Sequence, residues 1–367
     1  MPQDLDREAE SGVALSLSRS DIRRAKRVYT RHKGAVDRLL AQCSAFGAGC
    51  RQNDFFTGAV LECFARHFLN NPSYRRLCLN HGIQPGNIRK YADLGSLPYI
   101  TAHSGNLEDI LPTAAASAIK LRCRQTLGGQ SFDIPLEARS LRRLRRAADN
   151  IGRACGLHSR EKVNYLFLTS SDGPQNDAWE MWRKTGAARL TKTGSCRTVS
   201  AWDAECSRIF EQYLSEGSAW RIIGSAEQIM QSAASVPISA ADFQAVRRSY
   251  ILVYTSWEEY NRLPRTEIAQ NFGISPGSVR AVCTAPLQLI PFCACEAGRL
   301  HVPVYSRIIV RCPQSLQPQT PDRTGLLQFI TPCLSACASF SVLTEYKGRL
   351  ETDCPCGRRA PVLIVEE

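Results

Sequence analysis

Short apolar runs alternate with amphipathic helical stretches from residue 119 to about residue 290. Residues 165–168 and 250–254 are the clearest runs, and each has the length of a strand. Helical periodicity is clearest over residues 138–155. This alternation is typical of α/β layer structures, in which helices cover a sheet. It predicts an α/β core, and the composition excludes collagen-like, coiled-coil and wholly disordered chains.

The segments on either side of this core have different patterns. Before it, the chain is α-rich, with helices expected over 21–42, 55–69 and 72–79. After it, the chain is rich in strands and cysteines. Within the core, further strands are expected at 188–190 and 281–282, and further helices at 203–215, 226–234 and 264–272; another strand is expected at 304–310. We therefore predict a flexible tail at 1–19, a helical region at 20–115, the α/β core at 116–290 and a β-rich, metal-stapled end at 291–367.

The beginning of the chain does not look like a secretory signal. Asp4, Asp6, Glu8 and Glu10 occupy the stretch where a signal peptide has an apolar segment. No stretch approaches the roughly 18 apolar residues of a membrane span. We therefore expect a cytoplasmic protein in which most of the 16 cysteines are reduced packing residues.

One group of cysteines has the spacing of metal ligands. Cys295 and His301 flank a turn at Gly298, and Cys354 and Cys356 follow near the end of the chain. Paired ligands on two distant turns commonly hold a structural Zn²⁺ ion, which takes four Cys or His donors in a tetrahedron. Cys293 is a competing ligand, and the alternative is a set of unrelated buried thiols.

Residues 264–280 resemble a helix-turn-helix, and a net charge of +12 makes DNA binding an alternative. The match is one short element within a long α/β pattern, and a strand is expected directly after it. We therefore expect no nucleic-acid partner.

Several blocks of the chain resemble a known family. They are DLGSLPYI at 93–100, FGI at 272–274, CEAGRLHVP at 295–303, GLL at 325–327, LTE at 343–345 and CPCGRR at 354–359. In this order they resemble the acyl-protein synthetases of the LuxE type, which are related to phenylacetate-CoA ligases and other adenylate-forming enzymes. The resemblance runs from about residue 55 to the end.

The resemblance implies an adenylate-forming large domain that makes an acyl-adenylate from ATP and a carboxylic acid and passes the acyl group to a thiol. A similar Cys/His set in related ligases favours zinc here. In an active enzyme, Gly128, Gly129, Gln130 and Ser131 would form the phosphate loop, and Glu345 would contact the nucleotide.

The chain departs from the family pattern where ATP chemistry needs particular groups. The Ser/Thr-rich phosphate loop falls on 124–129, which keeps its glycines but few hydroxyls. The Gly-Gly-Trp-Lys motif reads TSWE at 255–258, and the Glu-bearing strand end reads VCTAP at 282–286. The Thr-Glu-Asp turn reads TEY at 344–346. The thiol-bearing tail of the synthetases also has no counterpart after residue 359. We therefore expect the use of ATP and Mg²⁺ to be weakened or lost.

Two basic stripes, at 19–33 and at 139–146, are most often solvated faces, yet together they suit an acidic helix of an acyl-carrier protein. The preferred interpretation is an acyl-activation homologue of specialised-metabolite or fatty-acyl biosynthesis whose ligase activity is weakened or lost, as in a pseudoenzyme. It would work with an acyl-carrier protein or acyl-transfer enzyme on an acyl or aryl acid or thioester. The alternatives are an active ligase and a DNA-binding protein.

Overall fold

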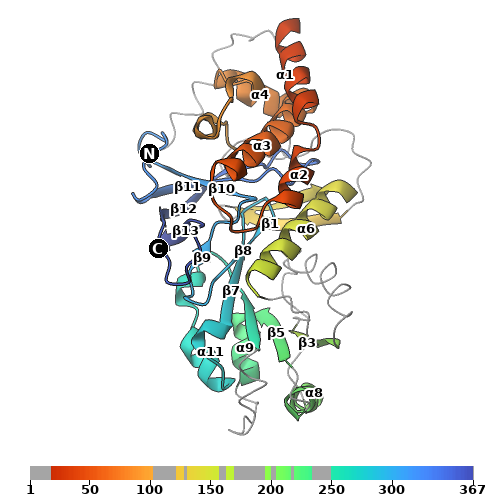
Figure 1. The fold of residues 1–367 in the computed structure, drawn as a ribbon, viewed down its shortest axis with the longest axis vertical. Helices are drawn as coiled ribbons and strands as arrows, with labels where there is room; N and C mark the ends of the chain where they lie inside the picture. Colours follow the sequence, from red (N-terminus) through yellow and green to blue (C-terminus); the bar gives the residue numbers. More distant parts are fainter. Residues whose placement is uncertain are drawn as a thin grey trace.

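The computed structural model describes residues 18–101, 121–127, 130–156, 163–168, 195–199, 204–215, 219–233 and 249–366. In these ranges the helical N-terminal part lies at one end of the molecule, the five-stranded sheet in the middle and the six-stranded sheet toward the other end (Figure 1). The α/β class, the α-rich beginning and the β-rich end expected from the sequence are confirmed.

The N-terminal part contains four helices, α1 (Arg19–His32), α2 (Ala35–Gln42), α3 (Cys50–Asn70) and α4 (Pro72–Asn80), followed by the 3-10 turns η2 (Pro85–Asn87) and η3 (Tyr91–Ser96). The prediction of one continuous helix over 21–42 was wrong. Gly34 has a φ of 81°, a left-handed conformation that glycine adopts readily, and it separates α1 from α2. Both helices can therefore pack against α3.

The six-stranded sheet has the order β4 (Cys196–Val199), β3 (Val163–Leu168), β5 (Ala219–Ser225), β6 (Tyr250–Tyr254), β7 (Val279–Thr284) and β8 (Pro291–Cys293). Its strands are parallel except for β8, which pairs antiparallel with β7. The helices of this part are α6 (Ala138–Ala154), α8 (Ala204–Ser215), α9 (Ala226–Ala233) and α11 (Arg265–Asn271), with 3-10 turns η5 (Tyr260–Arg262) and η6 (Pro276–Ser278). The strand expected at 188–190 lies outside the described residues.

The five-stranded sheet is antiparallel throughout, in the order β10 (Arg307–Arg311), β11 (Gly325–Ile330), β12 (Ser341–Glu351), β13 (Val362–Glu366) and β9 (Leu300–His301). A separate hairpin pairs β1 (Leu121–Leu127) with β2 (Gln130–Leu136). Strands β8 and β9 follow each other closely in the chain yet belong to different sheets, so the segment between them joins the two sheets.

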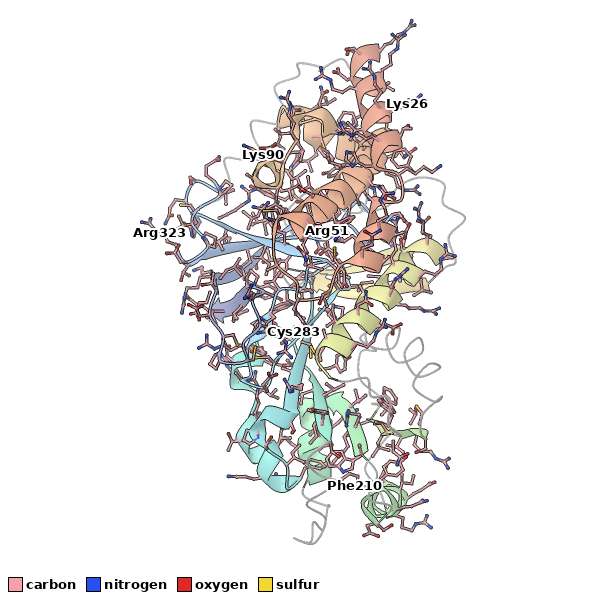
Figure 2. The ribbon with its side chains drawn as sticks, in the orientation of Figure 1. Lys26, Arg51, Lys90, Phe210, Cys283 and Arg323 are labelled. Carbon is pink, nitrogen blue, oxygen red and sulfur yellow. The ribbon has the colours of Figure 1, made fainter. Side chains whose placement is uncertain are left out.

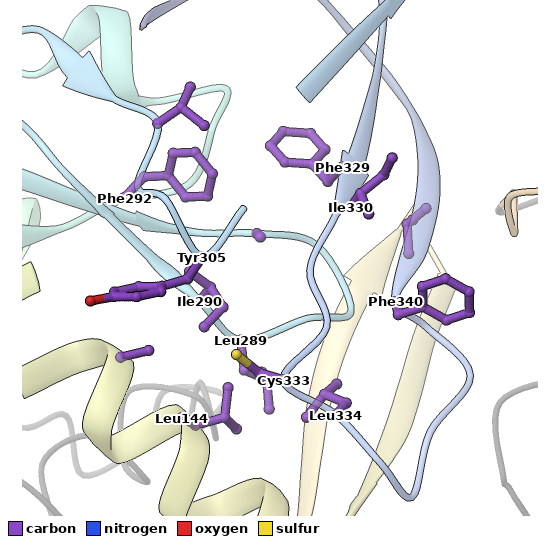
Figure 3. Packing of buried hydrophobic residues seen from close by; sticks show 14 of the residues in the cluster. Leu144, Leu289, Ile290, Phe292, Tyr305, Phe329, Ile330, Cys333, Leu334 and Phe340 are labelled. Atoms are coloured by element: carbon purple, nitrogen blue, oxygen red, sulfur yellow. The ribbon is translucent and has the colours of Figure 1, made fainter. Parts of the chain in front are cut away.

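One apolar cluster connects all three parts. Figure 3 shows Leu289 and Ile290, which follow β7, packed with Leu144 of α6 and with Cys333 and Leu334. The last two belong to the connection between β11 and β12, in which residues 331–340 are all buried. Small residues and hydrogen bonds to α3 and α6 allow this connection to lie inside the protein.

An ion-pair network joins α6 to the N-terminal helices, and Arg143 and Glu62 at its centre are buried. Arg143 donates to Asp37 of α2 at 2.9 and 3.0 Å and to Glu62 of α3 at 2.9 Å. Arg139 makes further contacts with both carboxylates. The hydrogen bonds from Arg143 hold the pKa of Asp37 at about 2. Two of the five arginines in the predicted stripe at 139–146 therefore point into the protein.

The cysteines of the described residues are free thiols, most of them buried. Within the same residues, none of the helices combines the length and the apolar character needed to cross a membrane.

Candidate functional site

The four predicted metal ligands lie together. The donor atoms of Cys295, His301, Cys354 and Cys356 are all within 4.8 Å of one another. The Sγ atoms of Cys295 and Cys354 are 3.6 Å apart, and His301 Nε2 lies 3.1 Å from the Sγ of Cys356. Thiolates bound to one zinc ion at about 2.3 Å are separated by roughly 3.8 Å in a tetrahedron. The spacing therefore fits four ligands around one ion.

Two similar turns present these donors. Gly298 donates its N–H to the carbonyl of Cys295 at 2.8 Å, and Gly357 donates to the carbonyl of Cys354 at 2.9 Å. The two glycines have φ values of 73° and 77°. Each turn is thus a Cys-x-x-Gly unit in which glycine supplies the left-handed residue. His301 comes from β9, directly after the first turn.

Hydrogen bonding fixes the orientation of the histidine. Its Nδ1 lies 2.9 Å from the carbonyl of Ala360, which can only accept, so Nδ1 carries the proton. The lone pair of Nε2 is then directed toward the thiols. This arrangement is the usual support for a metal-binding histidine.

Without a bound cation, the surroundings of Cys354 favour its protonated thiol. Burial and the neighbouring thiols of Cys356 and Cys295 raise the pKa of Cys354 to about 12. A metal ion reverses this tendency because it stabilises the thiolate form. All four donors come from the protein, which is typical of a structural and not of a catalytic zinc site.

The first turn is anchored to the α/β part. The hydroxyl of Tyr260 donates to the carbonyl of Gly298 at 2.5 Å, and Arg265 donates to the same oxygen at 2.6 Å. Because Tyr260 lies in η5 and Arg265 begins α11, both anchors come from the α/β part. No sequence pattern indicated this anchor, whereas the repeated Cys-x-x-Gly unit could have indicated paired turns.

The structure also brings together three segments that the family resemblance associates with the nucleotide. They follow β6 at 255–258, follow β7 at 284–286 and lie within β12 at 344–346. Trp257 donates its Nε1–H to the carbonyl of Thr284 at 2.8 Å, and its ring lies 6.2 Å from that of Tyr346. The first two segments lie at the carboxyl ends of parallel strands, which are where α/β folds place ligands.

Side chains at this position pack on one another. The Trp257 ring is also 5.4 Å from Phe292 and 5.5 Å from Phe329, and Trp257 is only 4% exposed. Burial and a hydrogen bond to Glu258 raise the pKa of the Tyr346 hydroxyl. Glu258 and Tyr346, which stand where the family has Lys and Asp, therefore interact with each other.

The turn after β7 has a backbone conformation that the sequence did not indicate. Leu287 and Leu289 have φ values of 58° and 62°, and both are buried. Positive φ is costly for such residues and is held here by hydrogen bonds, including those from Ala285 N to the carbonyl of Ile290 and from Ser339 Oγ to that of Leu287. This turn replaces the strand end at which the family has a carboxylate.

The other candidate nucleotide contacts are placed only in part. Gly128 and Gly129 lie outside the described residues, between the paired residues Leu127 and Gln130. Gln130 and Ser131 begin β2, and Glu345 is exposed on β12. Their contact with a nucleotide stays a prediction from the family resemblance.

The helix-turn-helix alternative lacks its second helix. Residues 265–271 form α11 as predicted, but residues 276–278 form a single 3-10 turn that leads directly into β7. At these residues no recognition helix is available for a DNA groove.

Comparison with known proteins supports the family resemblance. Residues 218–365 match the family model described as "Acyl-protein synthetase, LuxE". The chain is similar to a solved 2-hydroxyisobutyryl-CoA ligase in an open conformation with 2-HIB-AMP and CoA, with a TM-score of 0.65 and 14% identity over 87% of this chain and 75% of that chain. The postadenylation state of that ligase matches with a TM-score of 0.65 and 13% identity over 87% and 68% of the two chains. No curated protein matches the chain in sequence.

These matches show an adenylate-forming fold, and they confirm the resemblance to acyl-protein synthetases over residues 218–365. Residues 218–365 are thus similar to the acyl-protein synthetase family, and the chain shares the fold of a solved CoA ligase.

Proposed function

We propose that this chain is an acyl-activation homologue that holds an acyl or aryl carboxylic acid or its thioester and works with an acyl-carrier or acyl-transfer partner. In this proposal its own ATP-dependent ligase activity is weakened or lost. Its place would be in specialised-metabolite or fatty-acyl biosynthesis. The observation that carries the proposal is the contact of Trp257, Glu258 and Tyr346 at the carboxyl ends of β6 and β7.

Formation of an acyl-adenylate requires charge at defined positions. Mg²⁺ and the ribose hydroxyls need oxygen acceptors, and the triphosphate needs cations or backbone donors. At the matching positions this chain has Glu258 for a cation, Pro286 for a carboxylate, and Tyr346 for another carboxylate. Each substitution removes or inverts the required charge.

The new residues also have structural roles of their own. Tyr346 bonds to Glu258 and lies against Trp257, and Pro286 is buried in the turn that contains Leu287 and Leu289. The replacement residues thus make packing contacts of their own. These contacts support loss of the reaction, because a site that had only lost its catalytic groups would not need them.

The proposal includes a structural zinc ion bound by Cys295, His301, Cys354 and Cys356. The ion would hold the segment that follows β8 to the connection between β12 and β13. The four residues would bind it and exclude water, and the ion itself would supply no reaction step.

ATP–pyrophosphate exchange tests the loss of activity. The purified protein is assayed with Mg²⁺ and a panel of fatty and aryl acids, beside a Gly129→Trp variant as background. We expect no exchange above that background. We also expect at least one acid or acyl thioester to bind, measured by the change in intrinsic tryptophan fluorescence. Exchange clearly above background would make the chain an active ligase, with Gly128, Gly129, Gln130, Ser131 and Glu345 as the candidate nucleotide contacts.

Reversion variants make the test sharper. Glu258→Lys combined with Tyr346→Asp restores the family charges, and Tyr346→Phe is the matched control because it keeps the ring and loses only the hydroxyl. Millimolar ATP should bind the double variant better than the wild type or the control. Equal ATP binding by all three proteins would refute the role given to these residues.

Elemental analysis of protein purified without chelator tests the metal. We expect about one zinc per chain, lost in Cys354→Ser and retained in Cys312→Ser, which removes a thiol far from the cluster in sequence and structure. Zinc that survives in Cys354→Ser at full stoichiometry would contradict the assignment.

A further inference from the structure

We propose that four arginines on α1 form the docking row for an acidic helix of the partner protein. Arg19, Arg23, Arg27 and Arg31 recur at every fourth position. With a rise of 1.5 Å per residue, the row is about 18 Å long with a spacing of about 6 Å. The proposal deepens the proposed function by placing the partner on one helix face.

These arginines have no counterions within the described residues. All four are exposed, and no ion pair or hydrogen bond connects them to a described side chain. Figure 2 shows Lys26 and other nitrogen-tipped side chains of α1 directed away from the body. Arg24, Lys26 and Lys33 add charge beside the row, and Asp21 is the only acidic residue of the helix.

The row opposes the stability of its own helix. Like charges at i and i+4 repel each other and destabilise a helix. Arg19 and Arg23 also lie near the helix N-terminus, where the macrodipole disfavours cations. Such an arrangement is explained by a partner that neutralises it.

The opposite face of α1 is held by the protein. Ala25 is buried, Ile22 and Val28 are half-buried, and α1 packs against α3. Ser18 and Asp21 cap the N-terminus through hydrogen bonds to each other's backbone N–H groups. The row is thus presented on a helix whose position is already fixed.

The arginines of α6 provide a contrast. Arg139 and Arg143 are committed to Asp37 and Glu62, which leaves Arg142, Arg145 and Arg146 exposed at uneven spacing. Of the two basic stripes, only that on α1 offers a regular, unpaired row.

The regular spacing favours a protein helix as the occupant. A second helix presents its own i, i+4 carboxylates at the same spacing of about 6 Å, so four pairs can form in register. Each guanidinium can bind a carboxylate through two parallel hydrogen bonds.

Other acidic surfaces fit the row less well. The exposed positions of α1 are all charged or hydroxyl-bearing, whereas a helix that inserts into a membrane surface exposes an apolar face. They include no aromatic side chain on which unpaired bases could stack.

Fluorescence anisotropy with a defined probe tests the proposal. The probe is a stapled helical peptide of about 16 residues with glutamate at every fourth position, and its control has the same composition with the glutamates scrambled. The full-length chain is compared with a variant in which Arg19, Arg23, Arg27 and Arg31 are all changed to Gln. A second variant changes Arg142, Arg145, Arg146 and Arg153 to Gln, which removes the same charge from exposed positions of α6.

We expect the periodic peptide to bind the wild type and the α6 variant, and to bind the α1 variant about tenfold or more weakly. The scrambled peptide should bind weakly to all three. An equal loss of peptide affinity in both variants would show that only net charge matters, and it would overturn the proposal. So would stronger binding of anionic phospholipid vesicles or duplex RNA than of the peptide.

One competitor lies in the chain itself, since Asp4, Asp6, Glu8 and Glu10 precede the row. Peptide binding that appears only after these four residues are changed to Asn or Gln would assign the row to that segment and overturn the proposal. Neither result bears on ATP exchange, so failure of this inference and failure of the proposed function remain distinguishable.

Discussion

Replacing Arg143 by Met tests whether the ion-pair network that joins α6 to α2 and α3 stabilises the fold. The side chains of Arg143 and Glu62 are only 4% and 3% exposed, so the variant leaves a buried carboxylate without its main counterion. Removal of one partner from a buried pair costs about 3 to 5 kcal/mol. Arg139 approaches Glu62 only at 3.4 Å and compensates little. We therefore expect the free energy of unfolding in urea to fall by about 3 to 5 kcal/mol.

Two further variants make this result interpretable. Arg142→Met changes the exposed neighbour on the same helix and should stay within about 0.5 kcal/mol of the wild type. Glu62→Gln added to Arg143→Met removes the unpaired charge and keeps an acceptor for the N–H of Val36, which Glu62 binds at 3.1 Å. The double variant should recover most of the loss. If Arg143→Met changed stability by less than about 1 kcal/mol, or if the double variant recovered nothing, the reasoning would be refuted.

Two other perturbations follow from single side chains. Burial lowers the pKa of His67 to about 3, so its neutral form is the folded one; stability is full above the unfolded pKa of 6.5 and is lost as the pH falls toward 3. Between pH 6 and 4, the free energy of unfolding of His67→Gln should therefore fall less steeply than that of the wild type, by up to about 1.4 kcal/mol per pH unit. An unchanged slope in urea titrations would contradict this. Gly298→Ala places a Cβ 1.9 Å from Arg265, at a residue whose φ is 73°. We therefore expect this variant to have a lower melting temperature and to release its metal faster to a chelator. Gly82→Ala is the control, because Gly82 also has a positive φ but a Cβ there would have no atom within 4 Å.

The sequence predicted those features that depend on local pattern. Periodicity located α3, α6, β3 and β6 to within a few residues, and the Cys/His spacing selected the four residues that meet at the candidate metal centre. Gly34 shows the limit of this reasoning, because apolar residues at helical spacing on both sides of it suggested a continuous helix and only the backbone shows the break.

Features that depend on tertiary packing could not be read from the sequence. Leucine gives no indication of a positive φ, and Leu287 and Leu289 adopt one because buried contacts and the bond from Ser339 outweigh the local cost. Likewise, Arg142 and Arg143 are adjacent in one basic stripe, and only the position of Asp37 and Glu62 shows that one is buried and the other exposed.

A metal ion held by the two Cys-x-x-Gly turns would also restrict the conformations of the unfolded chain. Cys295 and Cys354 are 59 positions apart, so an ion held by both turns would close a loop of that length. By the chain-entropy relation used for disulfides, a permanent link of this size restricts the unfolded ensemble by about 4 kcal/mol. During synthesis the hairpin at 295–301 offers only two donors, and the ring closes only when the second turn is available. Metal supply would then set when β13, which follows the second turn, pairs with β9.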